Sequence, residues 1–218
     1  RALNSTLHRE RWKYSKSEAV LQCLDVAATQ PTIIGAEQDG VQVTKSPASP
    51  ITFGFDLQQA PEAMARLCYA KEAIFIYVTK PLNAAIEIEH IDSTLPVFMT
   101  LNNNIEATVL ERFLGDDVAQ SALWINLGQG AHLMHSRNSL AIAKLHWQYL
   151  AVDIGKDSHY VLNNHATGAG LRRQDIQISI SGPGGHAEIT SAAMIGRKNA
   201  LDQQLTLEHR VPNCSSQQ

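Results

Sequence analysis

Short stretches in which apolar and polar residues alternate run through the chain from Ala73 onward. The alternation is clearest in Ile86-Glu-Ile88-Glu, in Ile176-Gln-Ile178-Ser-Ile180 and in Leu205-Thr-Leu207-Glu. A period of two is typical of a β-strand with one buried face. We therefore predict short strands at 73–78, 84–91, 95–101, 105–113, 122–127, 131–135, 140–152, 158–163, 171–180, 186–195 and 203–211.

Clusters of Gly, Asn, Asp and Pro separate these strands, as is typical of turns. They lie at 102–104, 115–117, 128–130, 153–157, 168–170 and 182–185. Many short strands at regular spacing predict a sandwich, a barrel or a β-solenoid. Alanines that open strands at 107, 131, 143 and 187 are 24, 12 and 44 residues apart. The first two intervals share a 12-residue unit, which, doubled, would make one coil of a β-helix, whereas the third breaks the period unless an insertion is allowed.

The first third of the chain has a different pattern. Residues 15–28 predict a short amphipathic helix, because a serine and a glutamate at its start have the spacing of a capping box. Residues 57–71 predict a second short helix, and the Pro- and Gly-rich residues 30–56 are expected to be loop or linker. We therefore divide the chain into an N-terminal helical and linker segment, 1–72, and a β core, 73–218.

Composition and charge exclude several classes of protein. The longest wholly apolar run, Ala73–Val78, is far shorter than the roughly 20 residues that cross a bilayer, and no export signal opens the chain. A net charge of −3 argues against a nucleic-acid binder. Cys23, Cys68 and Cys214 are too dispersed for a disulfide framework or a metal motif, which fits a reducing compartment. We expect a cytoplasmic protein that binds neither membranes nor nucleic acid.

Nine histidines raise the question of a metal site. His132 and His135 are three positions apart, so on one strand they point to opposite faces and cannot share a metal unless a turn separates them. His159, His165 and His186 have no ligand-type neighbour at a useful spacing in the sequence. We therefore expect these histidines to be polar residues on strand faces.

Other signals for catalysis or cofactor binding are weak. Residues 181–186 lack the Lys-Ser/Thr of a phosphate loop, so we expect a turn there and no ATP binding. Asp116-Asp117 could bind Ca²⁺ or act as a carboxylate pair, but acidic residues are common in a turn. His209 lies five residues before Cys214, and the favoured interpretation of that thiol is a half-buried, inert side chain. We assign no catalytic, cofactor-binding or metal-binding residue, and keep only His209 and Cys214 as weak candidates.

Four segments in order along the chain carry a resemblance to a known family. They are Arg9–Ser15, which contains Trp-Lys-Tyr-Ser, then Ile105–Phe113, Gly130–Leu133 and Leu207–Gln217. Together they resemble the SufB/SufD family of iron-sulfur cluster assembly scaffold proteins. The Trp-Lys-Tyr-Ser stretch is similar to the signature near the start of the SufD branch.

The resemblance implies a right-handed parallel β-helix with a small N-terminal helical segment, and a scaffold without enzymatic activity of its own. A SufD subunit pairs with SufB, and each contacts the SufC ATPase. The iron-sulfur cluster is built on the assembled complex, so we expect none on this chain alone. The family continues through further coils and helices, and its cluster-interface cysteine and histidine lie there. We therefore expect a β core that is cut at its C-terminal end and an isolated chain that self-associates through the open edge.

Two other functions stay open. A carbohydrate-active β-helix enzyme, a polysaccharide lyase or hydrolase, needs a groove of paired carboxylates and sugar-stacking aromatics. With 6% aromatic residues and no acidic pair beyond Asp116-Asp117, the sequence supports this function poorly. The third alternative is a purely structural β-solenoid.

Overall fold

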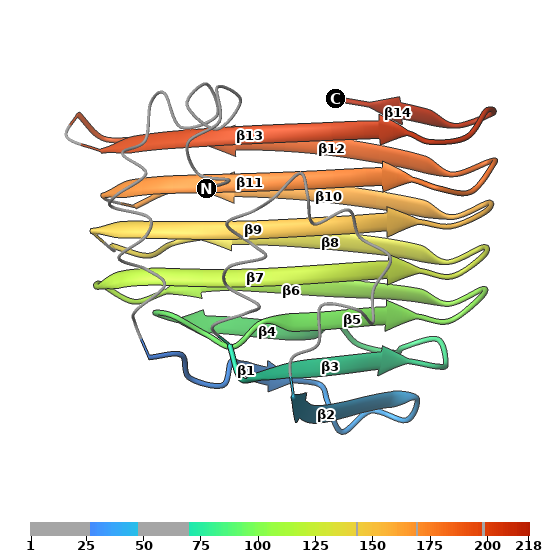
Figure 1. Ribbon diagram of the computed structural model, residues 1–218, viewed down its shortest axis with the longest axis horizontal. Helices are drawn as coiled ribbons and strands as arrows, with labels where there is room; N and C mark the ends of the chain where they lie inside the picture. The colour runs from blue at the N-terminus through green and yellow to red at the C-terminus, as the bar shows by residue number, and fades with distance from the viewer. Residues whose placement is uncertain (1–26, 48–69, 143, 169, 198) are drawn as a thin grey trace.

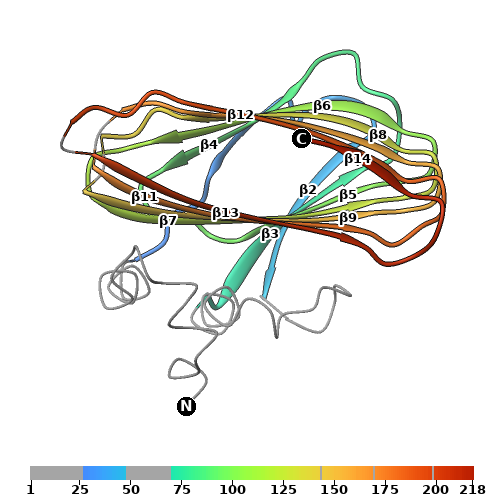
Figure 2. The same ribbon diagram turned by 90° about the horizontal axis from the view of Figure 1, so that it is seen from above.

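A computed structural model describes residues 27–47, 70–142, 144–168, 170–197 and 199–218, whose strands form two seven-stranded sheets that face each other (Figures 1 and 2). The first sheet has the order β1 (Thr32–Ile34), β4 (Ile86–Ile91), β6 (Glu106–Leu114), β8 (His132–Ser139), β10 (His159–Ala166), β12 (His186–Ala193) and β14 (Ser215–Gln217). The second sheet has the order β13 (Ala200–His209), β11 (Leu171–Ile180), β9 (Leu145–Ile154), β7 (Val118–Leu127), β5 (Val97–Leu101), β3 (Glu72–Val78) and β2 (Val41–Pro47).

From β3 onward the chain alternates between the sheets and makes parallel pairs with the coil before it. In the middle coils Ala107 pairs with Leu133, Leu133 with Tyr160 and Tyr160 with Ala187, so one coil takes 26 or 27 residues. This confirms the predicted mainly-β parallel solenoid, with a coil somewhat longer than the doubled 12-residue unit. Within the described residues, no helix is long and apolar enough to span a membrane.

The loop predicted for residues 30–56 is wrong for β1 and β2. Both strands pair antiparallel with the first parallel coil, β1 with β4 and β2 with β3. The Pro and Gly content of this stretch hid a short alternation in which Val41 and Val43 pack against the core. Apart from residues 27–28 and 70–71, which are not helical, the helices predicted at 15–28 and 57–71 lie outside the described residues.

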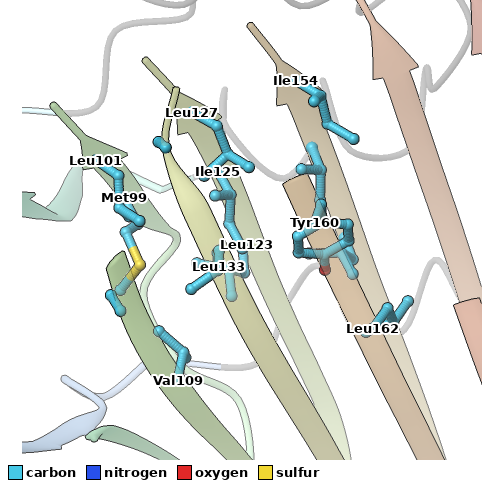
Figure 3. Close-up of a cluster of buried hydrophobic side chains, with 14 of the residues drawn as sticks. Met99, Leu101, Val109, Leu123, Ile125, Leu127, Leu133, Ile154, Tyr160 and Leu162 are labelled. Carbon is cyan, nitrogen blue, oxygen red and sulfur yellow. The ribbon is translucent and has the colours of Figure 1, made fainter. Parts of the chain in front are cut away.

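The core lies between the two sheets. Ile86, Ile88, Ile176, Ile178 and Ile180 are each at most 1% exposed, so the inward phase predicted from their alternation is confirmed. Figure 3 shows apolar side chains from both sheets meeting in this interior. Because each fully buried side chain of this size stabilises the fold by roughly 1.5–3 kcal/mol, this stack is the main cohesive element of the solenoid.

The turns that lead from the second sheet to the first stack on one another in a column. Each contains a residue with φ between 53° and 77°, and these residues are Asn104, Gly130, Asp157, Gly184 and Asn213. The backbone N–H groups of the first four donate to carbonyls of the next turn, for example Gly130 to Lys156 at 2.8 Å and Gly184 to Asn213 at 2.9 Å. A Cβ added to Gly182 would lie 2.0 Å from Lys156 N, so successive turns approach backbone to backbone. The turn predicted at 182–185 is confirmed.

The predicted strand 140–152 is displaced in the structure. Residues 140–142 lie outside the strands, with Ile142 N donating to Gly115 O at 3.0 Å, and β9 runs instead from Leu145 to Ile154. Leu140 and Ile142 are exposed, so their apolar character misled the prediction.

Candidate functional site

The interior of the solenoid is divided into an apolar half and a polar half. Along β8 the inward side chains change from Leu133 to His135 and Arg137, and along β9 they change in the opposite order, from His146 and Gln148 to apolar residues. Hydrogen bonds join the polar halves of the two sheets, from Gln148 Nε2 to Ser139 Oγ at 2.8 Å and from Asn164 Nδ2 to Gln174 Oε1 at 3.0 Å.

Glu111 of β6 is the centre of a buried cluster that we call the inner cluster, made of His90, Glu111, His135 and Arg137. Arg137 Nε donates to Glu111 Oε2 at 2.5 Å, and His135 Nε2 lies 3.2 Å from the same oxygen. His90 Nε2 lies 3.1 Å from Glu111 Oε1. None of the four side chains is more than 1% exposed.

Burial and the neighbouring charges act in opposite directions on the Glu111 carboxyl. Burial opposes its ionisation, but the Arg137 guanidinium and the hydrogen bonds to His135 and His90 hold the pKa of Glu111 well below its usual range. Burial also lowers the pKa of His135, which favours the neutral ring. With the proton on Nε2, 3.2 Å from Glu111 Oε2, the other ring nitrogen Nδ1 accepts from Tyr160 Oη at 2.9 Å.

The inner cluster therefore has the properties of a structural ion pair. Its carboxylate already binds a guanidinium, and a solute could reach it only if the coils opened. Arg137 also lies over the ring of Phe113, with 4.9 Å from Cζ to the ring centroid. Sequence reasoning missed Glu111, although it has the inward phase of Val109 and Phe113 on its strand.

A second cluster of histidines lies on the outside of the first sheet. His132, His159 and His186 occupy equivalent positions on β8, β10 and β12, because His159 pairs with His132 and with His186. Their ring centroids are 5.8 Å apart for His132 and His159, and 4.7 Å apart for His159 and His186. Successive histidines of this row are 27 residues apart in the sequence, which is the length of one coil.

Glu188 completes what we call the outer cluster, made of His159, His186 and Glu188. Glu188 Oε1 lies 3.3 Å from the Nε2 atoms of both histidines, and the potential ligand atoms of the three residues all lie within 4.8 Å of one another. The side chains are 30–45% exposed, so the cluster is accessible from solvent. His186 Nδ1 is 2.6 Å from Ser215 Oγ of β14.

The structure corrects one expectation about the histidines and confirms another. For His186 the expectation of no ligand-type neighbour at a useful spacing in the sequence is wrong, since Glu188 lies two positions later on the same strand face. For His159 the neighbours come from the coil repeat, which places it beside His186 and Glu188, 27 and 29 residues further along the chain. His132 is exposed and His135 is buried, so the prediction that they point to opposite faces is confirmed. His165 is exposed on β10 and lies 3.3 Å from Asn138 Oδ1, away from this cluster.

The two weak candidates from the sequence have separate surroundings. His209 Nε2 is 3.0 Å from Ser216 Oγ. Cys214 is a half-buried free thiol that packs against the core, and its Sγ donates to Val211 O at 3.2 Å. Among the described residues no hydrogen bond joins His209 to Cys214, and Cys23 and Cys68 lie outside those residues.

Asp116 and Asp117 are exposed in the turn between β6 and β7. Their backbone N–H groups point at Asp92 Oδ1, at 3.2 and 3.5 Å. The Asp116-Asp117 pair thus lies in the kind of turn that the sequence favoured.

Comparison with known proteins gives one family match. The family model described as "SUF system FeS cluster assembly, SufBD core domain" matches residues 92–218. This segment contains β5 to β14, and with them the inner cluster apart from His90 and the whole outer cluster. No curated protein matches the chain.

Proposed function

Because this chain belongs to the SufBD core-domain family of the SUF iron-sulfur cluster assembly system, we propose that it is a scaffold subunit of the SufD type. The observation that carries the proposal is the match over residues 92–218, more than half of the chain and nearly all of the parallel coils. The Trp-Lys-Tyr-Ser stretch at residues 12–15 supports the SufD branch over the SufB branch.

We propose that the chain pairs with a SufB-like subunit and works in the cytoplasm with a SufC-like ATPase. An iron-sulfur cluster is then cargo of the assembled complex. The absence of a phosphate loop from the sequence supports ATP hydrolysis by a partner. The burial of Glu111 supports a scaffold without catalytic activity of its own, because a general acid or base must reach its substrate.

Co-purification of the chain with SufB-like and SufC-like subunits tests the proposal. We expect the tagged chain to retain the SufB-like subunit and to retain the ATPase only when the SufB-like subunit is present. Ile178→Asp places a charge in the core and should abolish the interaction together with the fold. His165→Ala changes an exposed side chain and should leave the interaction intact.

Two outcomes would contradict the proposal. The first is a folded chain that retains neither subunit. The second is saturable ATP binding or polysaccharide cleavage by the chain alone, which would favour an enzyme.

A further inference from the structure

We propose that the outer cluster is a binding site for one divalent transition-metal ion, with His159, His186 and Glu188 as its ligands. The site lies on the outer face of β10 and β12, on the opposite side of the first sheet from the inner cluster. The inference rests on side-chain geometry alone and does not depend on the proposed scaffold function.

The distances from the carboxylate to both imidazoles fit a tetrahedral ion. Ligand atoms about 2.0–2.2 Å from a tetrahedral Zn²⁺ lie roughly 3.3–3.6 Å from one another. Glu188 Oε1 is 3.3 Å from His159 Nε2 and 3.3 Å from His186 Nε2. Both carboxylate-imidazole distances therefore equal the ligand-to-ligand distance expected around a tetrahedral Zn²⁺.

The strand register explains why these atoms converge. His159 and His186 are directly paired on neighbouring parallel strands, and Glu188 lies two positions beyond His186 on the same face. A side chain at this diagonal position is within reach of its cross-strand neighbour. The ligands are thus held by the sheet backbone, without the entropy cost of ordering a loop.

The hydrogen bonds around the cluster leave nitrogen lone pairs for a cation. His159 is 34% exposed as a side chain, yet its Nε2 is buried, faces Glu188 and has no hydrogen-bond partner. His186 Nε2 lies within hydrogen-bond distance of Glu188 Oε1, at 3.3 Å, and in the tautomer in which Nδ1 donates to Ser215 Oγ the lone pair of Nε2 faces that carboxylate, where a cation can bind both. Metal-ligating histidines commonly have such a partner on the second ring nitrogen.

The donor set indicates the class of metal. Two imidazoles and one carboxylate suit Zn²⁺, Co²⁺, Ni²⁺ or Cu²⁺, whereas Mg²⁺ and Ca²⁺ prefer oxygen ligands alone. Within the described residues no lysine or arginine is paired with Glu188, so no fixed cation competes for the carboxylate. Three protein ligands leave a fourth position for water or a ligand from outside the chain.

Zn²⁺ titration of the full chain by calorimetry tests the site, with Co²⁺ absorption as the spectroscopic readout. We expect one Zn²⁺ per chain, a tetrahedral Co²⁺ spectrum without thiolate charge transfer, and loss of both in His159→Ala, His186→Ala and Glu188→Gln. His165→Ala, on the same strand, is the matched control and should bind as the original chain does. Ser215→Ala should weaken binding by roughly 10- to 100-fold, because it removes the partner that orients His186.

Several outcomes would overturn the proposal. They are no saturable Zn²⁺ binding, equal binding by the Glu188→Gln and original chains, or a thiolate band in the Co²⁺ spectrum. Circular dichroism accompanies each variant, and Glu188→Gln keeps the shape of the side chain, so it tests the site even if a histidine variant does not fold.

Discussion

The inner and outer clusters combine the same residue types, histidine and a single glutamate, on opposite sides of one sheet. In the inner cluster Arg137 provides a permanent cation and burial excludes water, so the Glu111 carboxylate is already neutralised. In the outer cluster the Glu188 carboxylate faces imidazole nitrogens and solvent. In the inner cluster these groups stabilise the fold, because Arg137 neutralises the carboxylate. In the outer cluster the same groups are available to a metal ion, because the neutralising charge must come from solution.

Among the changes that test this difference between the clusters, removal of Glu111 should have the largest effect on the free energy of unfolding. We expect Glu111→Ala to reduce the free energy of unfolding by about 3–5 kcal/mol, because it leaves the buried Arg137 guanidinium without a counter-ion. Denaturant unfolding measures the loss. Glu188→Ala in the outer cluster is the matched control, and as a surface change it should stay within about 0.5 kcal/mol.

A double variant separates the ion pair from the packing around it. Glu111→Leu with Arg137→Met removes both charges, so it should recover most of the stability that Glu111→Ala loses. If Glu111→Ala is as mild as Glu188→Ala, then the inner ion pair does not stabilise the fold as we describe.

Zinc should stabilise the chain through the outer cluster alone. At a free Zn²⁺ concentration 100-fold above the dissociation constant, the free energy of unfolding should rise by about 2.7 kcal/mol. Thermal unfolding with and without Zn²⁺ measures the change, and a chelator should reverse it. Glu188→Gln should abolish the shift while Glu111→Ala keeps it, and the opposite result would exchange the roles of the two clusters.

Acid should destabilise the polar half of the interior through His146. Burial lowers the pKa of His146 from 6.5 to about 3, so between these values the unfolded chain binds a proton that the folded chain does not. Between pH 7 and pH 5 this side chain should reduce the free energy of unfolding by about 2 kcal/mol. Below that range the lowered pKa of Glu111 acts in the same direction, because its stabilising charge is lost as the pH falls.

Unfolding of the original chain and of His146→Gln at several pH values isolates the histidine contribution. The stability difference between them should change as the pH falls from 7 to 5. A difference that stays constant would mean that His146 takes up a proton in the folded state.

The smallest expected effect is that of His132, the third histidine on the outside of the first sheet, on Zn²⁺ binding. The His132 ring is 5.8 Å from that of His159, and His132 is outside the convergent group of ligand atoms. His132→Ala should therefore weaken Zn²⁺ binding less than Ser215→Ala does. If calorimetry gives the reverse order, then His132 is a ligand and the coordination differs from our assignment.

Much of the solenoid could be predicted from the sequence because its strands have one buried face. Ile86-Glu-Ile88 and Ile176-Gln-Ile178 show the alternation directly, and their inward phase is as predicted. The β1 and β2 strands could not be found in this way, since both lie in a Pro- and Gly-rich stretch and β1 has only three residues. Leu140 misled the prediction because its apolar side chain is exposed just after the end of β8.

The two clusters escaped prediction for different reasons. Glu111 has the inward phase of its strand, but only pairing between coils shows that Arg137 is available to neutralise it. His159 and His186 are 27 residues apart, and the coil length estimated from the alanines was too short to superimpose them. The approach of His159 to His186 and Glu188 is therefore a product of repeat length, which local spacing in the sequence does not reveal.

The length of the stacked turns determines which side chains of the following strands point outward. Asp157 and Gly184 hold equivalent left-handed positions, and two residues later His159 and His186 begin their strands in register. One residue inserted between Asp157 and His159 would shift β10 by one position and move each of its side chains to the opposite face. The imidazole of residue 159 would then turn toward the core, and Tyr160 would turn toward solvent. The outer cluster is thus encoded as much by the constant length of the turns as by the residues that form it.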